Sequence, residues 1–412
     1  MKVAIIGAGL SGLTSLKHCM AENYFVDVFE QTGLIGGVWN YSDQYGIDED
    51  GIPIHTVMYK DLTTNLPKDL MTLNEFPYPD HPPSYLPQER VLKYFQDYTK
   101  HFNLLPHIKF FSQVIKVEPT NSTKWEITIK DLKTKMIQTK EYDAVMVCNG
   151  HYHSPRYPDI PGKEKFNGKQ LHSSVYRTPD IFKDKKVLII GAGASGVDIA
   201  EKVEKVAEKV IISFNKENLF KLSKTLNLKP LVKEIYEDGV IFVDGTNENV
   251  DVIIYCTGYL YKFPFLSERC GIKIDNRWVK YLYKSVINVE YPTMGFIGIT
   301  WECCVVPVTE TQVRFFVASL KQTFPLPSKE EMMEDINNHL KYIKSLGWTE
   351  KDMHRCGVDQ GRYFDDVTST ARIEKVPSVL HKLYLQVRKD RSNRKVYYKV
   401  IDDDNFIQTQ LL

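Results

Sequence analysis

Two copies of one glycine-rich motif constrain this chain of 412 residues more than any other feature. The first spans residues 7–12 with the sequence GAGLSG, and the second spans residues 191–196 with the sequence GAGASG. An apolar run precedes each copy and a helical pattern follows it, which is the setting of a βαβ dinucleotide-binding unit. Such glycines let the backbone approach a pyrophosphate, whose charge is favoured at a helix N-terminus. The two copies therefore predict an α/β fold with two Rossmann-like dinucleotide-binding domains.

The residues that end the second strand of each unit predict which dinucleotide binds there. In the first unit, Glu30 follows strand 25–29, and a carboxylate at this point accepts hydrogen bonds from an unphosphorylated ribose. This site therefore suits FAD. The corresponding strand of the second unit ends without an acid, in Ser213, Asn215 and Lys216. A hydroxyl, an amide and an ammonium suit a ribose 2′-phosphate, so NADPH fits better than NADH. The alternatives are that Glu30 and Lys216 are ordinary surface charges.

The order of the expected elements divides the chain into two interleaved domains. A buried strand closes each unit, at residues 143–150 and 251–259, so that the chain looks internally duplicated. Residues 41–87 lack clear periodicity and are expected to form loops that cover a site. We expect further helices at 88–102, 195–208 and 310–321, and strands at 108–117 and 125–129. The predicted division is an FAD-binding domain formed by residues 1–165 and 261–412, the second part ending in a charged helical tail, with an inserted NADPH-binding domain at residues 166–260.

Charge and cysteine content exclude several classes of protein. Because the formal net charge is only +1, there is no electrostatic reason to expect nucleic acid or an anionic membrane as a partner. The seven cysteines include no CxxC pair and no metal-ligand spacing, so neither a redox disulfide of the thioredoxin-reductase type nor a metal site is expected. The first strand begins at Lys2, and no apolar run approaches the roughly 20 residues that span a bilayer. We therefore expect a cytoplasmic protein without a membrane anchor, and a homo-oligomer. The alternative is a secreted protein whose leader is missing from this sequence.

Several motifs resemble those of the flavin-containing monooxygenase family. Residues 166–176, FNGKQLHSSVY, match its FxGxxxHxxx(Y/F) signature and lie just before the second glycine motif, where that signature belongs. The short chain and its polar C-terminus are similar to the insect members, which include pyrrolizidine-alkaloid (senecionine) N-oxygenases. The resemblance covers nearly the whole chain and includes Gly36-Gly37-Val38-Trp39, Thr63-Thr64-Asn65, Phe76-Pro77-Tyr78-Pro79 and Thr257-Gly258-Tyr259.

This resemblance implies an enzyme that uses NADPH and O₂ to oxygenate soft nucleophilic heteroatoms. In the family, FAD reduced by NADPH reacts with O₂ to give a C4a-hydroperoxyflavin, whose distal oxygen is attacked by a tertiary amine or a sulfide. The cofactor supplies this chemistry, so no catalytic triad or carboxylate pair is required. Asn65 corresponds to the asparagine beside the flavin and the nicotinamide, where a neutral amide can both donate and accept hydrogen bonds. A turn asparagine before Pro67 is the alternative.

The glycine motifs and the resemblance together assign cofactor contacts along the chain. His172 of the signature is expected to be structural, joining the linker to the second domain. The residues that we expect to bind the two cofactors are Gly7, Ala8, Gly9, Leu10, Ser11, Gly12, Glu30, Gln31, Gly37, Val38, Trp39, Thr64, Asn65, Leu66, Val114, Gly191, Gly193, Ser195, Gly196, Val197, Asp198, Ser213, Asn215, Lys216, Thr257, Gly258 and Gln312.

Three other activities are compatible with two dinucleotide sites. A Baeyer–Villiger monooxygenase shares the resemblance but acts on ketones, and its signature typically ends in tryptophan where this chain has Tyr176. A reductase would pass electrons to a disulfide or a quinone, and an NADPH oxidase would release H₂O₂. The residues favour heteroatom oxygenation and do not identify the substrate, since fold resemblance cannot choose one.

Overall fold

A seven-stranded sheet carries the first glycine motif. The computed structural model describes residues 1–411 apart from residues 50, 80–82, 122, 216–225 and 391–394. The strands of this sheet run in the order β18-β19-β20-β7-β1-β2-β3, and those from β20 to β3 are parallel. They are β1 (Lys2–Ile6), β2 (Phe25–Phe29), β3 (Ile108–Lys109), β7 (Ala144–Val147), β18 (Leu282–Tyr283), β19 (Ile287–Asn288) and β20 (Met294–Phe296). The predicted first strand, beginning at Lys2, and the predicted strand at 25–29 are confirmed.

Both faces of this sheet are buried, which is why β1 reads as a continuous apolar run. Val3 and Ile5 pack against one core, and Ala4 and Ile6 pack against another on the opposite face. The first core includes residues of helices α1 (Leu10–Ala21), α2 (Gln88–His101) and α4 (Val305–Leu320). The second includes residues of an antiparallel sheet formed by β4 (Ser112–Pro119), β5 (Trp125–Asp131) and β6 (Ile137–Tyr142).

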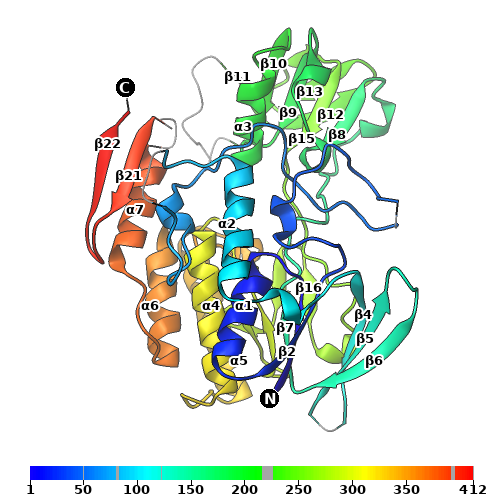
Figure 1. The fold of residues 1–412 in the computed structure, drawn as a ribbon. Helices are drawn as coiled ribbons and strands as arrows, with labels where there is room; N and C mark the ends of the chain where they lie inside the picture. Colours follow the sequence, from blue (N-terminus) through cyan, green and yellow to red (C-terminus); the bar gives the residue numbers. More distant parts are fainter. Residues whose placement is uncertain (50, 80–82, 122, 216–225, 391–394, 412) are drawn as a thin grey trace.

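The second glycine motif belongs to a five-stranded sheet, drawn in green above the first in Figure 1. Its strand order is β11-β10-β9-β15-β8, and all four pairings are parallel. Helix α3 (Ala194–Val203) covers one face, and a small antiparallel sheet covers the other. The strands are β8 (Lys169–His172), β9 (Lys186–Ile190), β10 (Lys209–Ser213), β11 (Asn227–Lys229) and β15 (Val252–Tyr255), with β12 (Val232–Tyr236), β13 (Gly239–Phe242) and β14 (Asn247–Asn249) in the small sheet.

The last third of the chain returns to the first sheet, because β20 pairs with β7. A hairpin of β16 (Lys273–Asp275) and β17 (Trp278–Lys280) precedes this return. The helices that follow α4 are α5 (Lys329–Ser345), α6 (Gln360–Ala371) and α7 (Ser378–Lys389). Within the described residues, no helix combines the length and the apolar character that crossing a bilayer requires.

Two details of this last region differ from the prediction. The expected helical tail ends instead in an antiparallel hairpin of β21 (Val396–Val400) and β22 (Phe406–Gln410), drawn in red in Figure 1. Val396 and Tyr398 of this hairpin are buried against α7. The charged local sequence does not predict this tertiary contact. Helix α4 begins at Val305, five residues before the predicted start, because Pro307 lies in its first turn, where a missing N–H costs nothing.

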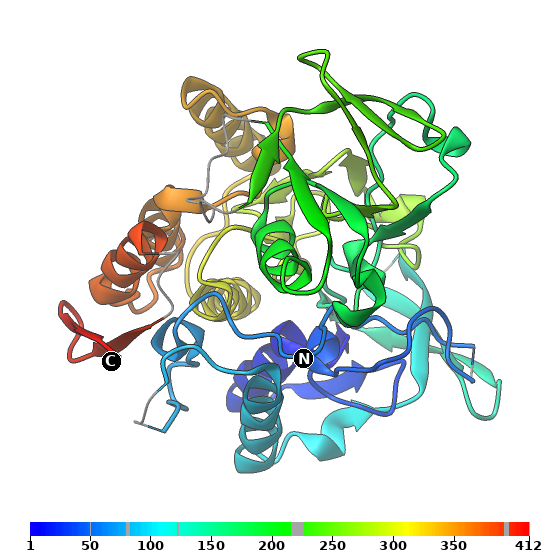
Figure 2. The same ribbon diagram turned by 90° about the horizontal axis from the view of Figure 1, so that it is seen from above.

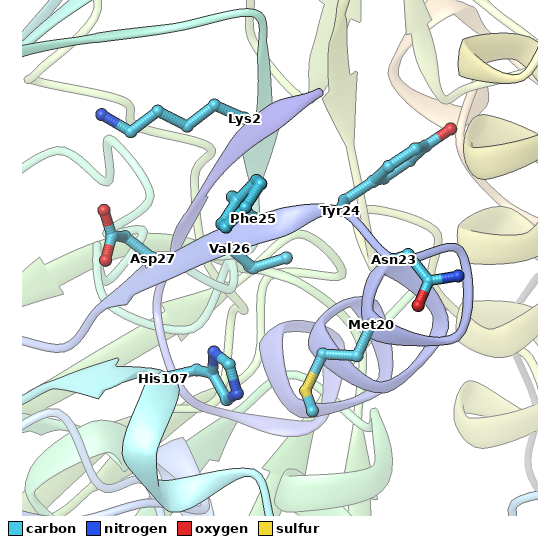
Figure 3. A pocket seen from close by; sticks show the side chains of 8 residues that line it. All are labelled: Lys2, Met20, Asn23, Tyr24, Phe25, Val26, Asp27 and His107. Carbon is cyan, nitrogen blue, oxygen red and sulfur yellow. The ribbon is translucent and has the colours of Figure 1, made fainter.

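One surface hollow lies away from both glycine motifs. It is lined by residues at the amino ends of β1 and β2, among them Lys2, Phe25 and Asp27, and by His107 (Figure 3). Open α/β sheets bind their ligands at the carboxyl ends of the strands. The cofactor sites are therefore to be sought at the opposite end of this sheet.

Candidate dinucleotide-binding sites

The first glycine turn has a geometry that only glycines allow. Gly7 has a φ of +104°, and its N–H donates to the carbonyl of Phe29 (2.8 Å) at the end of β2. A Cβ on Gly12 would lie 1.8 Å from the Gly7 carbonyl oxygen, so no side chain fits where α1 crosses the turn. A Cβ on Gly7 would lie 2.7 Å from the carbonyl oxygen of Cys148, just after β7. The turn that follows β1 is therefore packed closely against the ends of β2 and β7.

The second turn repeats this geometry contact for contact. Gly191 has a φ of +107°, and its N–H donates to the carbonyl of Ser213 (2.8 Å) at the end of β10. A Cβ on Gly196 would lie 2.0 Å from the Gly191 carbonyl oxygen, and one on Gly191 would lie 2.5 Å from that of Cys256, just after β15. The internal duplication predicted from the sequence is therefore present in three dimensions.

The space beside each turn suits a pyrophosphate. The N-cap residues of α1 and α3 are Gly9 and Gly193, which leave the helix N-termini without a side-chain cap. A Cβ on Gly193 would meet nothing within 4 Å, and one on Gly9 would meet only the backbone of Gly37, with the nearest atom at 3.6 Å. Open space, free backbone N–H groups and the positive end of a helix are the features that hold an anionic diphosphate. The residues present therefore fit a dinucleotide at both turns.

Glu30 lies beside the first turn as predicted, tied to the loops around it. Its Oε2 accepts a hydrogen bond from the backbone N–H of Ala8 (2.9 Å), and its Oε1 accepts from the N–H and hydroxyl of Thr32 (2.8 Å each). Burial raises the pKa of Glu30, and these hydrogen bonds act in the opposite direction. Gln31, which follows it, is half-buried. The carboxylate thus stands at the end of β2, next to the glycine turn.

The outer end of the second site departs from the prediction. Ser213 is fully buried and donates its hydroxyl to the carbonyl of Pro230 (2.8 Å), whereas the prediction places it against a 2′-phosphate. Asn215 follows as an exposed residue, and Lys216 lies outside the described residues. On α3, Ser195 is exposed and Val197 is half-buried.

Asn65 is exposed, on a segment that touches both units. Thr64 holds the backbone on either side of it, because its N–H donates to Leu86 (2.8 Å) and its hydroxyl donates to the carbonyl of Leu66 (2.8 Å). Leu62 packs against the core of the second sheet, whereas Leu66 packs against that of the first. We call residues 59–66 the bridging segment, since it spans the two sheets.

The chain that follows η1 (Gly37–Trp39), drawn in blue in Figure 2, lies beside the green helix α3. Two contacts that were not predicted from the sequence hold this part of the chain against the second unit. The hydroxyl of Tyr59 donates to Oδ2 of Asp198 on α3 (2.5 Å), so Asp198 is a buried anchor of the bridging segment. The buried guanidinium of Arg177 donates to the carbonyls of Ser42 (2.7 Å), Ser174 (2.9 Å) and Gln44 (3.1 Å). The position of Arg177, directly after the signature, was the only sequence signal for it.

The remaining predicted contacts fall into two groups. Those around the first turn are Leu10, Ser11, Val38, Trp39 and Val114, of which Val114 lies in β4 opposite Ile129. In the second unit, Gly258 has a φ of +80° with open space beside it, and its carbonyl accepts a hydrogen bond from Nε2 of His172 (3.1 Å). Since Nδ1 of His172 accepts from the N–H of Ser174 (3.1 Å), the ring is fully committed, which agrees with its expected structural role.

Gln312 is fully buried behind the first turn. Its Oε1 accepts from the N–H of Gly298 (2.8 Å), and its Nε2 donates to the hydroxyl of Tyr363 (2.9 Å). Gly298 in turn lies against Ser11 of the glycine motif, because a Cβ on it would be 2.4 Å from the Ser11 hydroxyl oxygen. Gln312 therefore fixes the loop that faces the turn.

His151 is a further residue that the sequence analysis passed over. It follows β7 at the carboxyl end of the first sheet, and position alone could have marked it. Its Nδ1 contacts the carbonyl of Gly298 (2.9 Å) and must carry the proton there, because a carbonyl only accepts. Nε2 is therefore an acceptor, and it is buried without a partner among the described residues. Burial lowers the pKa of His151 to about 4, so the ring is neutral at physiological pH.

Comparison with known proteins agrees with this geometry. The family model described as flavin-binding monooxygenase-like matches residues 1–224 and 219–399. Senecionine N-oxygenase from Tyria jacobaeae is 32% identical over 98% of this chain and 91% of its own, and flavin-containing monooxygenase FMO GS-OX-like 4 from Arabidopsis thaliana is 32% identical over 98% and 95%. The structure of S-allyl-L-cysteine S-oxygenase from Allium sativum superposes with a TM-score of 0.86 at 32% identity, covering 95% of this chain and 93% of its own. The chain therefore belongs to the flavin-binding monooxygenase-like family, whose members use FAD and NADPH to oxygenate nucleophilic heteroatoms.

Proposed function

We propose that this monooxygenase acts on a small tertiary amine or sulfide, and that Asn65 positions the reaction where the flavin and the nicotinamide meet. Bound FAD and NADPH supply the reduction of O₂ that makes one oxygen atom transferable. The overall reaction consumes NADPH, a proton, O₂ and the substrate, and it yields NADP⁺, water and the N- or S-oxide. The protein has to hold the two dinucleotides, place the substrate and exclude water.

The observation that carries this proposal is the placement of the bridging segment. Two of its residues pack on different cores, Leu62 on that of the second sheet and Leu66 on that of the first. Asn65 lies between these anchors with an exposed side chain, and Thr64 fixes the backbone around it. Ligands of open α/β sheets lie at the carboxyl ends of their strands, so a residue between the two sheets can meet both dinucleotides.

The chemistry of an amide suits this position. The Asn65 side chain offers N–H donors and a carbonyl acceptor at any pH, without a charge. It can therefore orient a reactive oxygen and the nicotinamide amide together, whereas a carboxylate would repel negative charge that develops on oxygen. The Tyr59–Asp198 hydrogen bond and the hydrogen bond from the backbone N–H of Lys60 to the carbonyl of Arg177 (2.9 Å) keep the segment against the second unit while this happens.

The assignment of residues to domains follows from the same arrangement. We infer that residues 1–165 and 261–412 form the FAD-binding domain and that residues 166–260 form the NADPH-binding domain, because β20 returns to the first sheet while β8 to β15 make up the second sheet and the small sheet that covers it. Glu30 would then hold the FAD ribose, and the open space at Gly193 would hold the NADPH diphosphate. The relatives named senecionine N-oxygenase and S-allyl-L-cysteine S-oxygenase support amines and sulfides alike as the substrate class.

The test compares Asn65→Asp and Asn65→Ala with the wild-type enzyme, and Asn337→Asp on the exposed face of α5 serves as the matched control. The Asn65 variants should retain FAD and consume NADPH but release H₂O₂, with product formation lowered roughly 100-fold. The control should couple NADPH to product like the wild type. Unchanged coupling in both Asn65 variants would show that Asn65 is a turn residue and would remove its proposed role.

A further inference from the structure

We propose that Arg277 and Trp301 form an anion-recognition subsite beside the reaction centre, which selects nucleophilic substrates that carry a carboxylate. This inference rests on the proposed function and adds a substrate class to it.

The starting observation is a half-buried guanidinium that no carboxylate of the described residues contacts, although Asp352 attracts it from beyond ion-pair distance. Arg277 lies in the turn between β16 and β17, with its Cζ 4.0 Å from the centre of the Trp301 ring. Across the described part of the chain, no hydrogen bond or ion pair engages this guanidinium. A charge that is partly withdrawn from water costs free energy unless it meets a partner. Arg277 therefore has an unused capacity for a planar anion, which a guanidinium binds with two parallel hydrogen bonds.

The neighbouring arginines show the contrast. Arg355 donates to Oε2 of Glu302 (2.6 Å), and Arg388 donates to Oε1 of the same carboxylate (2.6 Å). Arg355 also lies 5.4 Å from the Trp301 ring. The two arginines around Glu302 are thus paired, whereas Arg277, which contacts the same indole, is not.

The indole supplies a second unused donor. Nε1 of Trp301 is buried and finds no acceptor among the described residues. Leaving a buried donor unpaired costs free energy, so an acceptor is expected at this atom. A ligand carboxylate has enough lone pairs to satisfy both the indole N–H and the guanidinium.

Contacts connect this pair to the first glycine turn. The backbone N–H of Trp301 donates to the carbonyl of His354 (3.0 Å). The centre of the His354 ring lies 5.8 Å from the centre of the Tyr261 ring. The ring centres of Tyr261 and His151 are 5.6 Å apart. His151 is in turn hydrogen-bonded to Gly298, the residue that faces Ser11. The subsite is therefore part of one cluster with the loop at the FAD turn.

The same cluster reaches the second unit and solvent. The centre of the Tyr152 ring lies 4.2 Å from that of the His151 ring and 5.3 Å from that of the Tyr259 ring. Tyr259 follows the Thr257-Gly258 turn. Tyr152 is 44% exposed, so this end of the cluster lies at the surface. Burial lowers the pKa of His151 to about 4 and that of His354 to about 3, so both rings are neutral. Neither histidine therefore adds a positive charge, so Arg277 and the exposed Arg156, whose charge acts on it, supply the positive potential that an incoming anion meets.

Two isosteric sulfides test this subsite, 3-(methylthio)propanoate and its neutral amide, 3-(methylthio)propanamide. The wild-type holoenzyme should use the acid with the higher kcat/KM. Arg277→Gln should lower kcat/KM for the acid roughly 10- to 100-fold, through KM, and leave the amide unchanged. Arg277→Lys should recover part of the loss. Arg269→Gln, which alters an exposed arginine paired with Glu118, is the matched control and should change neither value.

The design separates this inference from the proposed function. Equal loss for both sulfides in Arg277→Gln would indicate a structural role and overturn the subsite, as would equal use of acid and amide by the wild type. A raised KM for NADPH or loss of FAD would assign the guanidinium to a cofactor phosphate and also overturn it. If neither sulfide is oxygenated, the proposed function fails, and calorimetric binding of the acid to the wild type and to Arg277→Gln still decides the inference. Tighter binding to the wild type supports the subsite, and equal binding refutes it.

Discussion

The hydroxyl of Tyr59 donates a 2.5 Å hydrogen bond to Oδ2 of Asp198, joining the segment that carries Asn65 to the helix that begins at the second glycine turn. Both side chains are buried, Tyr59 at 5% and Asp198 at 7% exposure. A carboxylate at this depth needs its donors, because an unsatisfied buried acceptor is costly. The contact couples the placement of Asn65 to the second dinucleotide site.

Removing this donor should weaken that coupling. Tyr59→Phe is expected to lower the free energy of unfolding by about 1–3 kcal/mol, because Asp198 loses a buried partner. NADPH affinity should fall while FAD content is kept, since the first turn does not use this bond. Denaturant titration and NADPH titration measure the two effects. Tyr397→Phe in the C-terminal hairpin is a control, which should leave NADPH affinity unchanged; an equal loss of affinity in both variants would contradict the account.

The open space at the second turn gives a sharper test of the NADPH site. Gly193 has a φ of −74°, which any residue adopts, and its Cβ would meet nothing within 4 Å. Gly193→Ala should therefore fold with wild-type stability and FAD content. Its methyl group would occupy the path of the diphosphate, so the KM for NADPH should rise roughly 10-fold, an estimate of about 1.4 kcal/mol in binding. Steady-state kinetics at varied NADPH provides the measurement, and an unchanged KM would place the diphosphate elsewhere.

The His172 ring predicts a pH dependence of stability. Burial lowers its pKa to about 4 in the folded protein, against about 6.5 when unfolded. Between these values the unfolded chain binds the extra proton, so the stabilisation is complete above pH 6.5 and is lost as the pH falls towards 4. The loss from this group is up to ~3 kcal/mol.

The measurement is the free energy of unfolding at several pH values for the wild type and for His172→Gln, which retains a donor for Gly258. The variant should be less stable at pH 7.5 and should show a smaller decline between pH 6.5 and 4. Other buried histidines titrate equally in both proteins, so the difference isolates His172. Parallel pH profiles would contradict the assigned burial of a neutral ring.

The elements that sequence predicted well are those whose local pattern and tertiary environment agree. β1 and β2 lie at the predicted residues because a strand buried on both faces reads as an apolar run. The glycine turns were predictable because their geometry tolerates no Cβ, as the 1.8 Å contact at Gly12 shows. By contrast, the hairpin at Val396–Val400 depends on burial against α7, which is a long-range contact.

The site shows the same division between local and long-range information. Glu30 and the glycines follow from spacing along one βαβ unit. The hydroxyl of Ser213 donates to the carbonyl of Pro230, seventeen residues away, a contact that the strand pattern does not reveal. Arg277 and Trp301 come from separate elements, and their meeting depends on the fold of the last third of the chain.

The most direct test of the central claim is the fate of molecular oxygen in the wild-type holoenzyme. The enzyme is supplied with NADPH, ¹⁸O₂ and 3-(methylthio)propanamide or a tertiary amine, and the product is analysed by mass spectrometry alongside NADPH and H₂O₂. We expect an S- or N-oxide with one ¹⁸O atom and one NADPH consumed per product. NADPH consumption that is matched by H₂O₂, without labelled product from either nucleophile, would show an oxidase and contradict oxygen transfer.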